Sequence, residues 1–151
     1  MWKHRYKPED FSYGVIPYHT QDTTISYLLI QHRAGHWAFP KGHMDQWESK
    51  IQTALRELQE ETWIMSEDII LTDTDTRYTE HYKFAYRGAS VRKTVQYILW
   101  QCQTQIEINP QATELQDARR CSYHEALQLI TFPVGQELLS KVHKILQSSW
   151  I

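Results

Sequence analysis

The order of apolar and polar positions divides the chain into short strands and helices. Two mostly apolar runs, "YGVIPY" at 13–18 and "ISYLLIQH" at 25–32, are typical of buried strands. The segment 33–43 contains two glycines and a proline, which predicts a loop. Its aromatic residues Trp37 and Phe39 are too apolar for an exposed loop, so we expect them to fill the core.

A second pattern, with apolar residues three and four positions apart, predicts a helix over 48–62. One stripe of this helix carries Ile51, Ala54, Leu55 and Leu58. Near the end of the chain, 123–130 and 134–149 have the same amphipathic pattern. Pro133 lies between them and suits the first position of the second helix.

Three further strands are predicted between these helices, at 68–73, 76–86 and 92–103, with "RGAS" at 87–90 as a hairpin turn. A polar segment follows the last of them. Strands on both sides of one helix, with helices at the end, predict an α+β sandwich of sheet and helices rather than a βαβ dinucleotide fold. Neither G-x-G-x-x-G nor G-x-x-x-x-G-K-[ST] occurs, so these phosphate-binding loops are absent.

Composition narrows the class of protein. The 151 residues, 41% of them apolar and 23% charged, predict one globular domain over 1–151. A formal net charge of −2 argues against a binder of duplex nucleic acid but allows a small anionic ligand. No membrane-spanning run or signal peptide is recognisable. The chain has only two cysteines, Cys102 and Cys121. The small number of cysteines and the lack of such segments predict reduced thiols in a cytoplasmic protein.

The predicted helix 48–62 carries an acidic face beside its apolar stripe. Glu57, Glu60 and Glu61 are spaced i, i+3 and i+4, where each like-charge pair costs a few tenths of a kcal/mol, roughly. A solvated surface is one interpretation of this cluster. We favour a site for Mg²⁺, with Mn²⁺ as a substitute, because Lys-Gly-His at 41–43 immediately precedes the helix and suits a phosphate chain.

The stretch 42–64 resembles the Nudix box, a motif of glycine, arginine and glutamates at fixed spacing. The positions that match are Gly42, Glu48, Arg56, Glu57, Leu58, Glu60, Glu61 and Ile64. The last glycine of the box is Trp63 here, and Trp47 occupies another position that is often glycine in this family. A glycine after the helix usually adopts a left-handed conformation, which costs a bulky residue about 1–2 kcal/mol.

Within this superfamily the chain is similar to the asymmetrical diadenosine tetraphosphate (Ap4A) hydrolases. The similarity rests on "HWAFPKGH" at 36–43 and extends through "RKTVQYILW" at 92–100 to "EALQLITF" at 125–132. The resemblance implies a Nudix-type α/β/α sandwich with a mixed central sheet. It also implies a Mg²⁺-dependent enzyme that cuts Ap4A asymmetrically to ATP and AMP by metal-assisted attack of water.

The resemblance assigns roles to the acids of the box. The expected metal ligands are Glu57, Glu60 and Glu61. Glu48 is either a weaker ligand or the partner of Arg56, which orients a glutamate rather than touching substrate. The general base is either Glu60 or Glu114, in "QATELQD" outside the box. Glu61 is expected to be essential for turnover.

Substrate contacts follow from the same resemblance. The expected phosphate contacts are Lys41, His43 and Lys93. Tyr86 and Phe132 are expected to enclose the adenine, with Tyr82 as an alternative to Tyr86, and His36 is a further candidate. Stacking of a base on an aromatic ring is worth about 1–3 kcal/mol.

Two rival functions stay open at this point. The first is a Nudix enzyme that acts on triphosphorylated or capped RNA 5′ ends, although the modest charge argues against a long RNA track. The second is a nucleotide-binding module with little activity, which the unusual Trp47 and Trp63 suggest. For the favoured function we expect a dinucleoside polyphosphate as the binding partner, no membrane association and a monomer.

Overall fold

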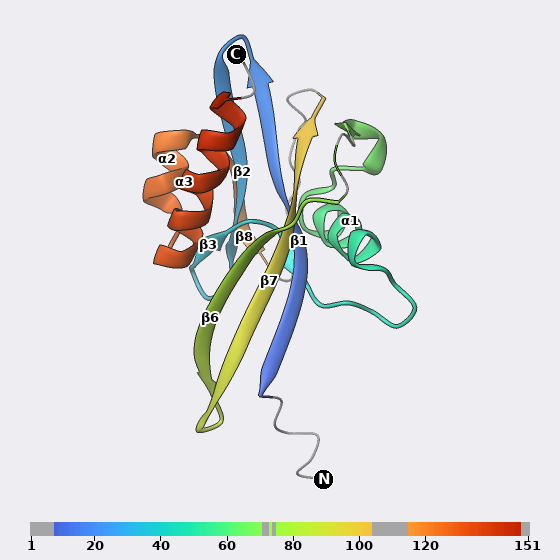
Figure 1. Ribbon diagram of the computed structural model, residues 1–151, viewed down its shortest axis with the longest axis vertical. Helices are drawn as coiled ribbons and strands as arrows, with labels where there is room; N and C mark the ends of the chain where they lie inside the picture. The colour runs from blue at the N-terminus through green and yellow to red at the C-terminus, as the bar shows by residue number, and fades with distance from the viewer. Residues whose placement is uncertain (1–7, 71–72, 74, 104–114, 149–151) are drawn as a thin grey trace.

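The structure is a computed structural model that describes residues 8–70, 73, 75–103 and 115–148 (Figure 1). A short 3-10 turn, Ser66–Asp68, follows the first helix. In chain order the other elements are β1 (Glu9–Gln21), β2 (Thr24–His32), β3 (Trp37–Ala38), β4 (Lys41–Gly42), α1 (Lys50–Thr62), β5 (Ile69–Ile70), β6 (Tyr78–Tyr86), β7 (Ala89–Cys102), β8 (Leu115–Ser122), α2 (Tyr123–Leu129) and α3 (Pro133–Ser148).

The strands form one mixed sheet. Its main path runs β3-β2-β1-β7-β5, with β4 paired to β1, β6 to β7 and β8 to β2. β1 and β7 are parallel from Glu9 opposite Arg92 to Tyr18 opposite Gln101, whereas the other pairs are antiparallel. The predicted mixed sheet is therefore confirmed.

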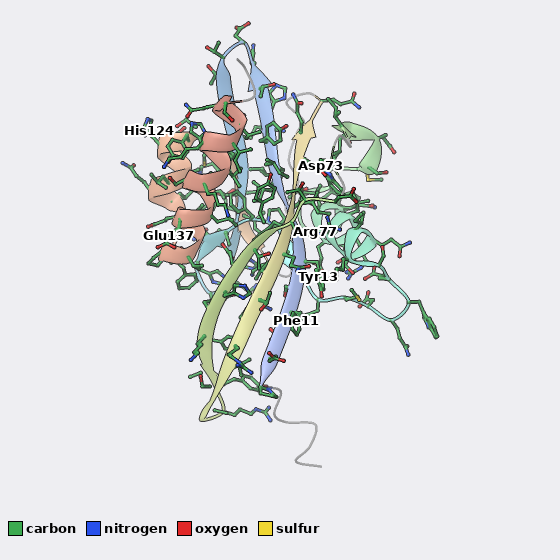
Figure 2. All side chains as sticks on the ribbon, viewed as in Figure 1. Phe11, Tyr13, Asp73, Arg77, His124 and Glu137 are labelled. Atoms are coloured by element: carbon green, nitrogen blue, oxygen red, sulfur yellow. The ribbon has the colours of Figure 1, made fainter. Side chains whose placement is uncertain are left out.

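Helices cover both faces of this sheet. In Figure 1, α1 lies on one face, and α2 and α3 lie on the other. Because successive strand residues point to opposite faces, Val15 packs in the core under α1 while Ile16 packs in the core under α2 and α3. The polar residues His124 on α2 and Glu137 on α3 are exposed and point away from the sheet (Figure 2). The α/β/α sandwich expected from the sequence is confirmed.

Most predicted elements are present, with three differences. The loop 33–43 contains the short strands β3 and β4, and the buried Trp37 and Phe39 fill the core as expected. β8 was missed, since "LQDARRCS" had been assigned to a polar segment. It is held in the sheet by antiparallel pairing with β2. The predicted strand 68–73 is observed only as β5, and 71–72 lie outside the described residues.

Local signals determine where several elements begin and turn. Ser49 caps α1 by accepting a hydrogen bond from the Gln52 backbone N–H, and the Gln52 side chain accepts one from the Ser49 N–H, a capping box. α3 begins at Pro133, as predicted. The hairpin between β6 and β7 turns on Arg87 and Gly88 alone, with φ of 50° and 78°. Two left-handed residues suit the right-handed twist of paired strands.

Both unusual tryptophans have left-handed backbones. Trp63 caps the end of α1 at φ 65° and donates its backbone N–H to the Gln59 carbonyl. A tryptophan therefore adopts the left-handed capping conformation that a glycine usually adopts. Trp47 has φ 71° in the loop before α1 and is 93% exposed. The strain expected at Trp63 is thus present at both positions.

The cysteines and helices add two facts about the chain. Cys102 and Cys121 are free and buried, and burial raises the pKa of each thiol to about 11. Among the described residues, no helix combines the length and hydropathy needed to span a bilayer. The expectations of one domain over 1–151 and of a monomer stay predictions.

Candidate active site

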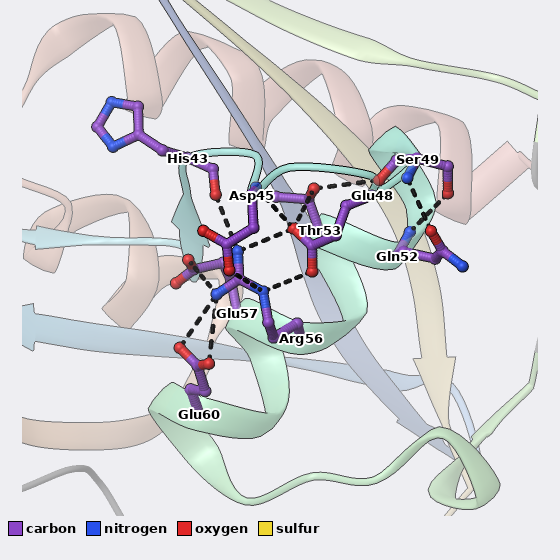
Figure 3. A network of polar contacts seen from close by, with 9 residues as sticks. All are labelled: His43, Asp45, Glu48, Ser49, Gln52, Thr53, Arg56, Glu57 and Glu60. Atoms are coloured by element: carbon purple, nitrogen blue, oxygen red, sulfur yellow. Dashed lines mark hydrogen bonds and ion pairs between the residues drawn. The ribbon is translucent and has the colours of Figure 1, made fainter.

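Arg56 is the centre of the polar network at the start of α1 (Figure 3). Its Nε donates to Glu48 Oε2 at 2.6 Å, and its Nη1 donates to Glu57 Oε1 at 3.0 Å and to Glu60 Oε2 at 3.2 Å. Its Nη2 donates to the His43 carbonyl oxygen at 2.9 Å. One guanidinium therefore connects the loop before the helix with three glutamates.

Glu48 is fully engaged in this network. Besides Arg56, its Oε1 accepts hydrogen bonds from the Asp45 backbone N–H at 2.8 Å and from Thr53 Oγ1 at 3.0 Å. The Arg56 hydrogen bond, followed by the Asp45 bond, lowers the pKa of Glu48 to about 2. Of the two alternatives for Glu48, this geometry favours the partner of Arg56, which orders the loop–helix junction.

Glu57 is seated against Gly42. A Cβ atom at Gly42 would overlap the Glu57 carboxyl group, so only glycine allows this carboxyl group to approach strand β4. Burial raises the pKa of Glu57 and the charge of Glu60 adds to the effect, while Arg56 and a hydrogen bond shared with Glu61 oppose it. Glu61 is only 2% exposed. The acidic face therefore points partly into the protein.

The donor set fits a divalent cation by its chemistry. Carboxylate oxygens are the hard ligands that Mg²⁺ prefers, and burial beside Glu60 makes the charged form of Glu57 costly, which a bound cation would offset. Within the described ranges, no three His, Cys, Asp or Glu side chains are already arranged around one metal position. Arg56 engages both Glu57 and Glu60 in this arrangement.

Asp10 is a site residue that the sequence analysis missed. Lys93, 6% exposed, donates from Nζ to Asp10 Oδ2 and to Ser12 Oγ, both at 2.6 Å. The other oxygen of Asp10 lies 2.9 Å from Nε2 of the exposed His43. Although burial opposes the effect, Lys93 and His43 lower the pKa of Asp10. Asp10 thus holds two of the three predicted phosphate contacts.

Lys41, the third predicted phosphate contact, is surrounded by these charges. Burial lowers its pKa and Lys93 lowers it further, while Glu61, Glu80 and Asp10 oppose the shift. A lysine with a lowered pKa and a second ammonium nearby favours an anion beside it. Lys41 also lies at the border of the cavity described next.

A cavity of about 340 Å³ opens between β6, the loop before β4 and the first turn of α3. Its lining includes His36, Lys41, Glu80, Tyr82 and Phe132. The His36 ring stacks on His32 at 4.5 Å between centroids and lies 5.6 Å from Phe132. Burial, followed by the Lys41 charge, lowers the pKa of His36, which favours the neutral ring. The cavity therefore offers aromatic walls with few polar groups.

The two expected adenine contacts are not equally placed. Phe132 lines the cavity, and Tyr86 does not. Tyr86 is 47% exposed at the end of the β6–β7 hairpin, with the Arg87 guanidinium 5.2 Å from its ring centre. Tyr82, the alternative named from the sequence, lines the cavity. Glu114, the second candidate for the general base, lies outside the described residues.

The family of the chain follows from comparison with known proteins. A model of the NUDIX domain matches residues 10–141. The chain belongs to the Nudix family. This Nudix chain is 36% identical over 131 residues to the asymmetrical bis(5′-nucleosyl)-tetraphosphatase of Rattus norvegicus, and the match covers 85% of each chain. The mouse enzyme of the same name is 34% identical over the same length.

A solved structure supports the same assignment. The C. elegans Ap4A hydrolase binary complex matches with a TM-score of 0.76 and 26% identity, covering 92% of this chain and 98% of that chain. The predicted family, its resemblance to Ap4A hydrolases and the α+β class are confirmed, and the chain is a Nudix hydrolase. The roles of individual residues stay predictions.

Proposed function

We propose that this chain is a Mg²⁺-dependent enzyme that hydrolyses Ap4A asymmetrically to ATP and AMP. The similarity to relatives named asymmetrical bis(5′-nucleosyl)-tetraphosphatase supports the substrate class. The observation that carries the proposal is the position of Lys41. Lys41 lines the cavity and interacts electrostatically both with Glu61 of the acidic helix and with Glu80 of the cavity.

This position suits the two ends of a nucleotide. A polyphosphate beside Lys41 would lie next to the acidic face of α1, and an attached base could enter the cavity walled by Phe132 and Tyr82. Lys93 adds a second ammonium, which Asp10 and Ser12 hold in place. A fixed cation stabilises negative charge that develops on a transferring phosphoryl group without the cost of reorganisation.

Residues of the box then have distinct tasks. Glu57, Glu60 and Glu61 would hold the divalent ions, and Arg56 orients Glu57 and Glu60 through its Nη1 atom. Bound divalent ions neutralise a polyphosphate and lower the pKa of a coordinated water. Glu60, the most exposed of the three acids, is our candidate for accepting the proton of the attacking water at a carboxylate oxygen. Glu114 remains the alternative base.

The reaction is an in-line displacement. The water oxygen forms a bond to one phosphorus, the bond from that phosphorus to its bridging oxygen breaks, and the released proton passes to the base. Lys41 and Lys93 offset the charge that gathers on the phosphate oxygens. Most of the rate enhancement is expected from positioning and electrostatic stabilisation.

The test is a product analysis with one active-site variant. Incubation with Ap4A and Mg²⁺, followed by chromatography, is expected to give ATP and AMP in equal amounts, whereas two ADP would contradict the proposal. Glu61→Gln is expected to lower kcat by roughly 1,000-fold or more, with unchanged circular dichroism. Glu67→Gln, at an exposed position on the 3-10 turn, is the matched control and should keep full activity.

Further assays of the same protein separate the rival functions. Faster cleavage of a 5′-triphosphorylated oligonucleotide than of Ap4A would favour the RNA-directed enzyme. Tight binding of Ap4A in calorimetry, with product formation at background, would favour a binding module. Omission of Mg²⁺, and its replacement with Mn²⁺, test the metal directly.

A further inference from the structure

Glu80 is a buried acid without a hydrogen-bonding partner among the residues that the structure describes. It lies on β6 opposite Val95, is 6% exposed and lines the cavity. The first turn of α3 closes over it, because a Cβ atom on Gly135 would be 3.5 Å from Glu80 Oε2. A carboxyl group that lines a cavity and accepts no hydrogen bond from a described residue is available to a ligand.

The surroundings of Glu80 indicate the shape and chemistry of that ligand. The cavity volume of about 340 Å³ is at the small end of ligand sites. The flat rings of Phe132, Tyr82 and His36 line the cavity. Lys41 also lines it and interacts electrostatically with Glu61 of the acidic helix. Aromatic stacking combined with a polar group at the edge is how proteins recognise an isolated nucleobase.

We propose that Glu80 determines which purine the cavity accepts, by hydrogen bonding to the Watson–Crick edge of the base. A protonated carboxyl group donates O–H to adenine N1 and accepts from the N6 amino group. An ionised carboxylate instead accepts from guanine N1–H and from the N2 amino group. A protonated carboxyl group also suits guanine, by donating to O6 and accepting from N1–H, but the ionised form has no donor for adenine N1. Deprotonation of Glu80 therefore shifts the preference of the cavity from adenine toward guanine. This inference rests on the proposed function, since it concerns the base of the same nucleotide.

The environment allows Glu80 to change protonation near neutral pH. Burial raises its pKa to about 6, and the charge of Lys41 opposes the shift. The α3 residues that line the cavity, Pro133, Val134 and Gly135, carry no titratable side chain. The titratable groups that face the cavity or interact with Glu80 from the other elements are His36, Lys41, Tyr82, Lys83 and Tyr97. Of these, burial and Lys41 lower the pKa of His36, and burial raises the pKa of both tyrosines, whereas the pKa of Glu80 is about 6. Glu80 is therefore the group expected to change.

Calorimetric titration of the full chain with AMP and with GMP, at pH 5.5 and pH 8, tests this inference. The two nucleotides share the same titrating phosphate, so the ratio of their Kd values isolates the base. We expect the preference for AMP over GMP to fall on the order of 100-fold from pH 5.5 to pH 8. In Glu80→Gln the amide keeps its donor and its acceptor at every pH, so the ratio of the two Kd values should no longer change between pH 5.5 and pH 8.

Two further measurements complete the test. Phe132→Leu should weaken both nucleotides alike and leave the pH dependence of their ratio intact, because stacking tolerates either base. A wild-type ratio that does not change with pH, or no measurable binding of either nucleotide, overturns the inference even if Glu80→Gln fails to fold. Normal production of ATP and AMP from Ap4A would then leave the proposed function standing. A ratio that changes with pH in a protein that does not hydrolyse Ap4A would support the role of Glu80 and contradict the proposed function.

Discussion

Two glutamates of this protein, Glu48 and Glu80, have pKa values that are shifted in opposite directions. The Glu48 side chain is 17% exposed and has a pKa of about 2, while Glu80 is 6% exposed and has a pKa of about 6. Glu48 accepts hydrogen bonds from Arg56, Thr53 and a backbone N–H, whereas no described residue donates one to Glu80. Burial raises the pKa of Glu80, which lacks such donors, whereas the hydrogen bonds from Arg56 and the Asp45 backbone lower the pKa of Glu48.

This contrast distinguishes two parts of the site: the network around Arg56, whose polar groups bond one another, and the cavity around Glu80, where a ligand would supply the missing partner. The network around Arg56 satisfies its own members and fixes the acids of α1 before any ligand arrives (Figure 3). The cavity around Glu80 instead leaves a polar group available. Groups left unsatisfied in an otherwise satisfied structure tend to occur where function requires them.

The largest effect is expected from removing the centre of the network around Arg56. Arg56→Met leaves Glu48 without its cation and Glu57 facing Glu60 without neutralisation. We expect a loss of about 3 kcal/mol in the free energy of unfolding, measured by urea denaturation. Activity should fall by about 100-fold, because the acids lose their orientation.

Arg92→Met provides the matched control for this variant. Among the described residues, the exposed Arg92 side chain pairs with Glu9 at 3.4 Å, so its loss should change stability by less than about 0.5 kcal/mol. Equal effects of the two arginine variants would show that the network has no special role.

Gly42→Ala tests the seat of one acid. The added Cβ overlaps the Glu57 carboxyl group, which has to move. We expect a cost of about 1–3 kcal/mol in thermal unfolding and a clear drop in kcat. Gly35→Ala is the control: Gly35 has φ 103° with no atom near its Cβ position, so the substitution should cost stability through backbone strain and leave kcat unchanged. Full activity of Gly42→Ala would contradict our account of Glu57.

The pH dependence of stability sharpens the comparison between the two glutamates. The pKa of Glu80 is raised in the folded state from 4.5 to about 6, so its contribution is full below pH 4.5 and is lost as the pH rises through 6. Glu80→Gln should therefore match the wild type near pH 4 and exceed it by about 2 kcal/mol at pH 8.

Glu48 should give the opposite curve in the same urea titrations. Its folded pKa lies below 4.5, so its contribution is present above pH 4.5 and is lost as the pH falls toward 2. Glu48→Gln should be less stable than the wild type at pH 7, with the difference shrinking in acid. Parallel curves for the two variants would refute the contrast.

The smallest effect concerns the left-handed tryptophans. Trp47→Gly removes a strained backbone at a side chain that is 93% exposed, so we expect a gain of about 1 kcal/mol in thermal stability. Trp63→Gly should gain less, because Trp63 is only 56% exposed and its indole therefore loses more contacts than that of Trp47. Trp47→Ala keeps the strain and should show no gain. A loss of stability in Trp47→Gly would mean that its indole has a binding role.

Local patterns made part of this structure predictable. The acidic face of α1 follows from residues three and four apart, and Ser49 and Pro133 mark helix starts by their own chemistry. The sequence of β8 has no such local pattern. This strand is held in the sheet by its pairing with β2, which is distant in the sequence.

The residues that were missed depend on distant parts of the chain. Asp10 meets Lys93 across 83 positions of sequence. Glu80 becomes a cavity residue only because α3 closes over β6. A single sequence signals the acids of one helix, but it does not signal which acids a sheet and a later helix bring beside them.

The parallel pairing of β1 with β7 also limits how early the Asp10–Lys93 contact can form. Ten residue pairs join a strand near the amino end to one that finishes at Cys102. Closing so long a loop is slow, since its entropy is lost before the contacts form. During synthesis, α1 is complete at Thr62, yet Lys93, which donates to Asp10, emerges some thirty residues later, after roughly two to six further seconds of translation.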